Sequence, residues 1–124
     1  MIKLVFALRR RQDLSRDEFQ RYWRERHAPL VREHADTLGI RRYVQTHTLP
    51  DGVHAALRMS RGAPEPYDGV AELWFDSLEA LANGVASDDG QAAATALLDD
   101  ERRFIDHARS PLWLAEEHPV VTPA

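Results

Sequence analysis

The segment from residue 19 to residue 34, FQRYWRERHAPLVREH, contains the side chain with the clearest capacity for chemistry, that of His27. An imidazole can accept or donate a proton near neutral pH, so His27 is a candidate general base or general acid. Residues three or four positions apart lie on one face of a helix. The spacing therefore predicts a mostly apolar, inward-facing stripe made of Phe19, Trp23, His27, Leu30 and His34.

Pro29 interrupts the same segment two residues after His27. Proline has no amide hydrogen, and its ring crowds the carbonyl four residues earlier, here that of Glu25. We expect the helix to bend at this point. A bend away from the sheet would leave room for a small molecule beside His27, framed by Phe19 and Trp23.

Further polar side chains could reach the same place. Tyr43, Gln45 and His47 alternate onto one face of a strand predicted at residues 40–49. Asp106, near the end of the last predicted helix, could orient a histidine or carry a proton itself. If these groups face the helices, they converge on a pocket, because neighbouring strands lie side by side. Tyr43 and His47 could then donate hydrogen bonds to a developing enolate or phenolate oxygen.

Aromatic residues are the expected walls of this pocket. Flat apolar side chains suit a ring substrate, and the candidates are Phe19, Trp23, Trp74 and Phe104. A single histidine on an apolar face can instead be a core residue that is hydrogen-bonded within the protein. The polar groups predicted nearby favour a pocket, because buried polar groups need partners that water or a ligand can supply.

The composition excludes several kinds of site. The 124 residues include no cysteine, which excludes disulfides, thiolate nucleophiles and cysteine-based zinc sites. The six histidines show no HExxH or comparable close spacing, and the chain has no glycine-rich phosphate loop and no G-x-S-x-G motif. We therefore expect chemistry without a metal or nucleotide cofactor.

Charge and hydropathy narrow the range of partners. The net charge of −4 gives no electrostatic support for binding nucleic acid or an anionic membrane. The apolar run in MIKLVFALRRR is too short for a signal peptide or a transmembrane span. The expectation is a soluble cytoplasmic protein whose ligand is small and hydrophobic.

The elements that must position these residues follow from periodicity and capping signals. A capping box formed by Ser15 and Glu18 predicts a helix that runs to about Asp36 and ends at Gly39. Residues 50–68 contain three prolines and two glycines and are expected to form a long loop that gates the pocket. Strands are predicted at residues 2–9, 40–49, 69–76 and 111–121, with further helices at 77–86 and 89–107.

This order, β-α-β-β-α-β, predicts a single α+β domain over residues 1–124 with the ferredoxin-like fold, a four-stranded antiparallel sheet with helices on one face. Residues 2–8 and 70–75 are apolar on both faces of their strands, although helices can cover only one. Monomers rarely keep a large apolar face exposed. The sequence thus predicts a homodimer in which two sheets pack face to face as an α/β barrel. The alternative is a monomer in which a loop covers the second face.

Four segments resemble the EthD-like family of the dimeric α/β-barrel superfamily: LSRDEFQRYWRERHAPLV, YVQTH, YDGVAELWFDS and ERRFIDHARSPLWL. The resemblance extends from Met1 to about Val120, and YW…HAPLV is its most specific part. It implies the ferredoxin-like homodimer and a ligand cavity between sheet and helices. It also marks His27, His47 and Asp106 as site candidates, and implies cofactor-free chemistry on aromatic or polyketide-like substrates.

The leading hypothesis is a cofactor-independent enzyme of the lyase, isomerase or cyclase type, with His27 as general base or acid. Two alternatives remain open. One is a non-catalytic accessory protein of a degradative or biosynthetic pathway, holding a hydrophobic metabolite in the same pocket. The other is a cofactor-free oxygenase that acts on an electron-rich phenol.

Overall fold

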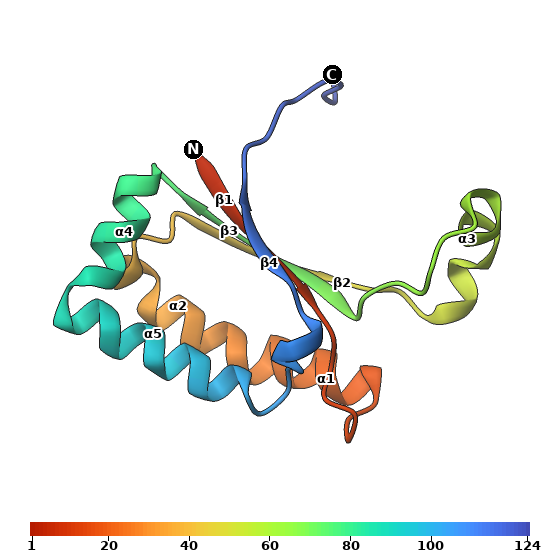
Figure 1. The fold of residues 1–124 in the computed structure, drawn as a ribbon, viewed down its shortest axis with the longest axis horizontal. Coiled ribbons are helices and arrows are strands. Elements are labelled where there is room, and N and C mark those ends of the chain that lie inside the picture. The colour runs from red at the N-terminus through yellow and green to blue at the C-terminus, as the bar shows by residue number, and fades with distance from the viewer.

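The computed structural model describes residues 1–124 and shows the predicted fold. Four strands form one antiparallel sheet in the order β2-β3-β1-β4. The helices α1, α2, α4 and α5 lie on one face of this sheet (Figure 1). None of the helices combines the length and apolarity needed to cross a membrane.

The elements are β1 (Ile2–Leu8), α1 (Arg16–Tyr22), a π-helical turn (Trp23–His27), α2 (Ala28–Leu38), β2 (Arg42–His47), α3 (Ala55–Arg61), β3 (Gly69–Phe75), α4 (Leu78–Ala86), α5 (Asp88–Glu101) and β4 (Leu112–Ala115).

The predicted start and stop of the first long helix are confirmed. The Ser15 side chain accepts a hydrogen bond from the Glu18 amide, and the Glu18 carboxylate accepts one from the Ser15 amide, which completes the capping box. Gly39 ends α2 with φ of 75°, a left-handed conformation that favours glycine. Local sequence signals therefore determine both ends of the helical segment that carries His27.

The bend expected at Pro29 takes the form of the π-helical turn Trp23–His27. The amide of Ala28 donates to the carbonyl of Trp23, five residues back instead of four. Pro29 then lies in the first turn of α2, where a missing amide hydrogen costs little. The helix is widened and continues in the same layer.

The π-helical turn changes which side chains face inward after His27. One extra residue in the turn rotates the following helix, so that Val31 is fully buried. Leu30 and His34, which were predicted on the inward stripe, are only half-buried. Strict helical spacing was wrong for these two positions, because it assumed an unbroken α-helix through Pro29.

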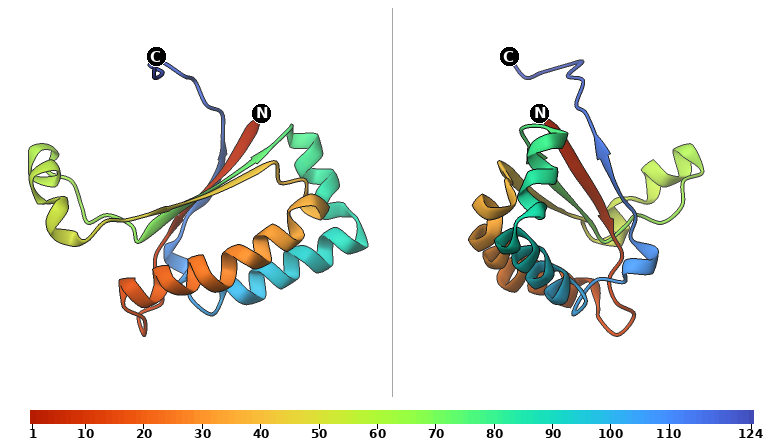
Figure 2. Two further views of the ribbon diagram at one scale, coloured as in Figure 1. Left: turned by 180° about the vertical axis from the view of Figure 1, so that it is seen from behind. Right: turned by 60° about the vertical axis from the view of Figure 1, so that its left-hand side comes forward.

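Residues 50–68 do not form one irregular loop, and the gating role expected of them is not supported. They contain a 3₁₀ turn, Asp51–Val53, and the short helix α3. This segment, which we call the β2–β3 arm, projects from the end of the sheet away from the other helices (Figures 1 and 2). None of its residues reaches the cavity described below.

The last predicted helix ends earlier than expected, at Glu101 instead of residue 107. Backbone hydrogen bonds redirect the chain here, because the Phe104 carbonyl accepts from the Arg11 amide and the Asp106 amide donates to the Arg9 carbonyl. Apolar residues at helical spacing continue as far as Ile105. The side chain of Ile105 is buried, but this residue lies beyond the end of the helix. The last strand, β4, is also shorter than the predicted 111–121.

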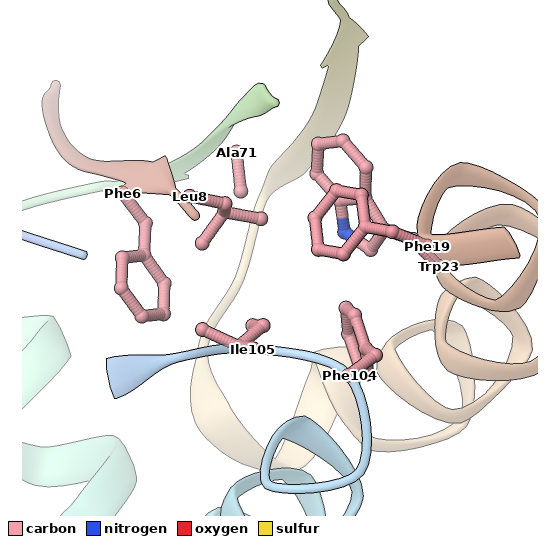
Figure 3. Packing of buried hydrophobic residues seen from close by; sticks show 7 residues of the cluster. All are labelled: Phe6, Leu8, Phe19, Trp23, Ala71, Phe104 and Ile105. Atoms are coloured by element: carbon pink, nitrogen blue, oxygen red, sulfur yellow. The ribbon is translucent and has the colours of Figure 1, made fainter. Parts of the chain in front are cut away.

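The core lies between the helix layer and one face of the sheet. Apolar side chains of β1 and β3 that point to the helices meet aromatic rings from α1, the π-helical turn and the segment after α5. Figure 3 shows the rings of Phe19 and Trp23 side by side, with Phe6, Leu8 and Ile105 across from them. A second cluster lies towards α4 and comprises Val31, Leu38, Ile40, Phe75, Ala93 and Leu97.

Gly69, the first residue of β3, permits the closest contact between helix and sheet. A Cβ atom at this position would lie 2.5 Å from Cζ3 of Trp23 and 2.9 Å from the carbonyl oxygen of Thr46. Real Cβ atoms do not approach other atoms so closely, so any side chain here would displace the indole ring. Glycine at this position therefore sets the depth at which Trp23 packs.

We predict that Gly69→Ala destabilises the protein by about 1–3 kcal/mol, the usual range for overpacking a core. Gly52→Ala is the matched control, because a Cβ atom at Gly52 would meet nothing within 4 Å. Urea denaturation of the two variants measures the difference. Equal stability of the two variants would contradict the close packing of Trp23 against β3.

Candidate functional site

A cavity of about 120 Å³ lies between the sheet and the helices beside His27. Of its 13 lining residues, 11 are hydrophobic, and the exceptions are His27 and Glu101. Leu112 of β4 is the only strongly exposed residue of the wall, so the cavity approaches the surface at this edge of the sheet. The apolar lining comprises Leu4, Phe6, Leu8, Trp23, Val31, Tyr43, Ala71, Leu73, Leu97, Ile105 and Leu112.

The imidazole of His27 is held by a buried carboxylate from the neighbouring helix. Nδ1 of His27 lies 2.8 Å from Oδ2 of Asp100, and both side chains are less than a tenth exposed. The other carboxylate oxygen accepts a hydrogen bond of 2.6 Å from the Tyr22 hydroxyl. The ring of Phe104 packs against the imidazole at 5.0 Å between centroids. These contacts determine both the position and the orientation of the ring.

The hydrogen bond to Asp100 also determines which nitrogen is available. A carboxylate accepts hydrogen bonds, so Nδ1 carries the proton that it shares with Asp100. Nε2 makes no hydrogen bond within the chain. Nδ1 of His47 is sealed from solvent, but Nε2 of His27 is not. The free lone pair of an imidazole on the cavity wall is therefore on Nε2.

Tyr43 of β2 lines the sheet side of the same cavity. Its oxygen accepts hydrogen bonds from Trp23 Nε1 at 3.1 Å and from Gln45 Nε2 at 3.0 Å. Burial, with a smaller contribution from the charge of Glu101, raises the pKa of Tyr43 to about 12, against the lowering effect of these hydrogen bonds. The phenol therefore keeps its proton, which has no acceptor in the chain and is free to bind a ligand oxygen.

His47 was predicted to line the site, but it lies behind Trp23. Its ring stacks on the indole at 4.5 Å between centroids, and its Nε2 donates to the side-chain oxygen Oε1 of Gln45 at 2.8 Å. Nδ1 is buried without a partner. Burial, together with the charge of Arg24, lowers the pKa of His47. The residue supports Trp23 and Gln45 and does not reach the cavity.

Trp74 lies on the opposite face of the sheet from the cavity, so its predicted role as a pocket wall is wrong. Ala71 and Leu73 face the helices, and strand alternation turns Trp74 the other way. Its ring contacts the charged ends of Lys3 and Arg42, at 5.2 and 4.6 Å from the centroid. Its aromatic surface belongs to the uncovered face of the sheet.

Asp106 does not approach His27, so the predicted partner was the wrong carboxylate. It follows α5 in a turn that directs it towards Arg109, at 4.0 Å. Asp100, six residues earlier, contacts the histidine instead. The error arises from the premature end of α5, because the prediction extended the helix through Asp106.

Phe19 and Phe104 are completely buried, and neither lines the cavity. Their rings contact each other at 5.6 Å between centroids, and Phe19 also contacts Trp23 at 5.6 Å. They brace the side chains that face the cavity. Of the four predicted aromatic walls, only Trp23 is in place.

Asp100, Glu101 and Tyr22 were missed as members of the site. For Asp100 a signal existed, because it interrupts a buried stripe with the spacing of Ala93, Leu97 and Phe104. An aspartate on such a stripe needs a buried partner. Nothing local marked Tyr22, whose role depends on where α5 crosses α1.

Glu101 contributes a carboxylate to the cavity lining. This carboxylate accepts a hydrogen bond of 3.1 Å from Nε2 of the partly exposed His107. This pair connects the cavity wall to solvent. No three His, Asp or Glu side chains lie close enough together to hold a metal ion.

Comparison with known proteins places the chain among a group of small α+β proteins. The sequence profile described as EthD domain matches residues 11–108. An EthD family protein from Bacillus halodurans is 22% identical, with a TM-score of 0.63 over 95% of this chain and 99% of the other. No curated protein matches.

Two further structures share the fold at lower identity. SnoaB from Streptomyces nogalater, described as a cofactor-independent oxygenase, is 16% identical, with a TM-score of 0.56 over 98% of this chain and 97% of the other. A protein from Thermobifida fusca, described as dimeric and ferredoxin-like, is 13% identical, with a TM-score of 0.55 over 92% and 88%. At these identities the likeness supports the fold alone.

We predict that His47 makes the protein less stable in mild acid. Its pKa is lower in the folded than in the unfolded state, so below the ordinary value of 6.5 the unfolded state binds the proton first. Stability is then lost as the pH falls from 6.5 towards the folded pKa, and it is unaffected above 6.5. His47→Phe keeps a ring on Trp23 but cannot titrate.

The measurement is the free energy of unfolding of both proteins at about pH 7.5 and about pH 5. The wild type should lose more stability between the two values than His47→Phe. An equal loss in both proteins would show that His47 does not contribute to the acid sensitivity.

Proposed function

The chain belongs to the EthD domain family, and from this premise we propose that it is a cofactor-independent enzyme that performs acid–base chemistry on a small hydrophobic substrate. The observation that carries the proposal is the His27–Asp100 pair on the wall of an apolar cavity. A carboxylate on Nδ1 holds the imidazole in one tautomer and one orientation. The opposite nitrogen is then a general base.

The arrangement suits proton abstraction next to a carbonyl group. Nε2 of His27 takes the proton from carbon, and negative charge develops on the carbonyl oxygen. The Tyr43 hydroxyl, still protonated, donates a hydrogen bond to that oxygen. The protonated His27 then returns the proton to a second carbon, which gives isomerisation, or to a departing hydroxyl group, which gives loss of water.

Glu101 provides a route for protons between the cavity and solvent. Its carboxylate lines the cavity, and its hydrogen-bond partner His107 is about one-third exposed. A lyase or cyclase must exchange protons with water when substrate and product differ in their proton count. The Glu101–His107 pair is placed for that exchange.

The size of the cavity favours a compact substrate. At about 120 Å³ it is smaller than the roughly 300–1,000 Å³ of most ligand pockets. A cavity of about 150 Å³ is known to hold benzene, so this slightly smaller cavity favours a substrate of at most one ring or a short branched chain. A multi-ring polyketide would require the wall at Leu112 to open.

A cofactor-free oxygenase is the second candidate. The support is the similarity in fold to SnoaB, which is described as such an enzyme. The same His27 could deprotonate a phenol and so make it electron-rich enough to react with oxygen. Oxygen consumption in the presence of substrate separates this activity from isomerisation or loss of water, which use none.

We predict that His27→Gln keeps the fold but lowers turnover by roughly two to four orders of magnitude, the usual contribution of general acid–base groups. His34→Gln is the matched control, because His34 lies on the same helix but outside the cavity. Substrates are found by screening small cyclic ketones and phenols for turnover, and thermal unfolding of each preparation measures the folded fraction.

Two outcomes would contradict the acid–base role. Full turnover in folded His27→Gln would show that the imidazole takes no part in the reaction. A compound bound stoichiometrically but unchanged on long incubation, with no turnover of any compound, would indicate the alternative of a binding protein.

We also infer that the protein functions as a homodimer. The face of the sheet opposite the helices carries apolar side chains, including Val5, Val70 and Trp74, and the charges of Lys3 and Glu72 there are paired with each other. An apolar face with compensated charge suits burial against a second copy. The Thermobifida fusca protein of the same fold is described as dimeric.

We predict a mass of about twice the 14.2 kDa of one chain in sedimentation equilibrium at micromolar concentration. Val70→Arg should produce folded monomers, because it places a charge within the uncovered face. Val85→Arg on α4, outside that face, is the control and should stay dimeric. A monomeric wild type would contradict the inference.

A further inference from the structure

A second hollow, of about 420 Å³, lies beside the β2–β3 arm and has none of the apolar character of the cavity. It is formed where the end of β1, the start of α1 and the arm meet. We call it the arginine cleft. None of its ten lining residues is hydrophobic: Arg9, Arg10, Gln12, Arg16, Asp51, Arg58, Glu65, Pro66, Asp68 and Arg109.

Two of the arginines, Arg10 and Arg16, form ion pairs within the floor of the cleft. Asp68 is only 2% exposed and accepts hydrogen bonds from the Arg10 amide, the Arg10 guanidinium and Nε of Arg16. Burial alone would raise the pKa of Asp68, but these hydrogen bonds outweigh it and lower the pKa below its ordinary range. Arg16 also pairs with Asp51. The charges of these four residues therefore balance one another.

Three arginines remain without a matching carboxylate at short range. Arg9 is held in place by a hydrogen bond of 2.7 Å to the Pro66 carbonyl and by the Tyr67 ring, 4.1 Å away, and neither partner is charged. Arg109 has only a contact at 4.0 Å with Asp106. Five arginines face three carboxylates in this cleft, although the whole chain carries a net charge of −4.

Arg58 is the most informative of the three. It extends from α3 into the cleft, forms no ion pair, and its Nε is buried without any hydrogen-bond partner. A buried donor that lacks a partner destabilises the protein that contains it. The two terminal nitrogens of the same guanidinium also make no hydrogen bond, but they are not sealed from solvent, so an acceptor from outside the chain can reach them.

We propose that the arginine cleft binds a small polar molecule through a carboxylate or phosphate group. Guanidinium groups match the two oxygens of either oxyanion with paired N–H donors. Arg9, Arg58 and Arg109 come from three separate segments and surround one space, so a single oxyanion can contact more than one of them. The absence of apolar lining separates this ligand from the hydrophobic substrate of the cavity.

The volume allows more than a bare ion. At about 420 Å³ the cleft lies within the range of pockets for small metabolites. Glu65 is the carboxylate of the lining that has no ion-pair partner, and it could accept a hydrogen bond from a hydroxyl or amino group of the same ligand. The site therefore fits a hydroxylated or amino-substituted acid or phosphate ester.

The test is isothermal titration calorimetry of the wild-type protein with inorganic phosphate and with citrate, at an ionic strength held constant with sodium chloride. We expect saturable binding of at least one probe with one site per chain. Binding of phosphate alone assigns a phosphate group, binding of citrate alone assigns a carboxylate, and binding of both assigns a general oxyanion site.

Variants on one helix separate a specific site from general attraction of anions. Arg58→Gln should weaken binding at least about tenfold, as expected for loss of a charge-assisted hydrogen bond. Arg61→Gln, also on α3 but outside the cleft and exposed, removes the same charge and should bind normally. Arg109→Gln is a second cleft variant and should weaken binding in the same way.

Thermal unfolding adds a readout that a merely structural arginine would not give. Without anion, Arg58→Gln should melt no lower than the wild type, because Arg58 has no partner to lose. With saturating anion the wild type should gain stability and the variant should not. The proposal is overturned if neither probe binds saturably, or if Arg58→Gln and Arg61→Gln lose binding equally.

Discussion

Pro29 has no amide hydrogen, and the arrangement of the site depends on how the helix accommodates this. The chain adds one residue to the preceding turn, and the Ala28 amide reaches back to Trp23. That turn brings Trp23, His27 and Val31 onto one buried face. An uninterrupted α-helix would turn Leu30 and His34 further inward than they are. A backbone constraint thus determines which side chains border the cavity.

The π-helical turn also ends in a buried polar residue, His27, which needs a hydrogen-bond partner. His27 enters an apolar layer, where an imidazole without partners would be destabilising. Asp100 from α5 supplies one partner, and Tyr22 and the surface Arg103 share the carboxylate. Replacing such a pair by well-packed apolar residues is often neutral or stabilising in proteins. Its presence here is therefore better explained by a requirement for an oriented imidazole than by stability.

The cavity and the arginine cleft differ in chemistry, although both include residues at the end of β1 or directly after it. Leu8 closes the apolar cavity, and the next two residues of the chain, Arg9 and Arg10, line the arginine cleft. Asp68 connects the base of the β2–β3 arm to this point through its ion pair with Arg10 and through the hydrogen bond that its backbone amide donates to the Leu8 carbonyl. One short stretch thus forms part of both walls, so a ligand in the cleft would contact residues adjacent to the cavity.

The sequence by itself determined the four strands and the long helices in their order, because capping, strand alternation and helical spacing are local, but it revealed neither α3 nor the π-helical turn. Ser15, Gly39 and the β-α-β-β-α-β pattern sufficed for the fold, and the stripe through Trp23 sufficed to place His27 inward. Only the tertiary structure decided which groups meet His27. Asp100, and not Asp106, contacts His27, because backbone hydrogen bonds to the segment between β1 and α1 end α5 early. Trp74 lies on the face of the sheet opposite the cavity. Such outcomes depend on contacts between segments far apart in the chain, which no local pattern encodes.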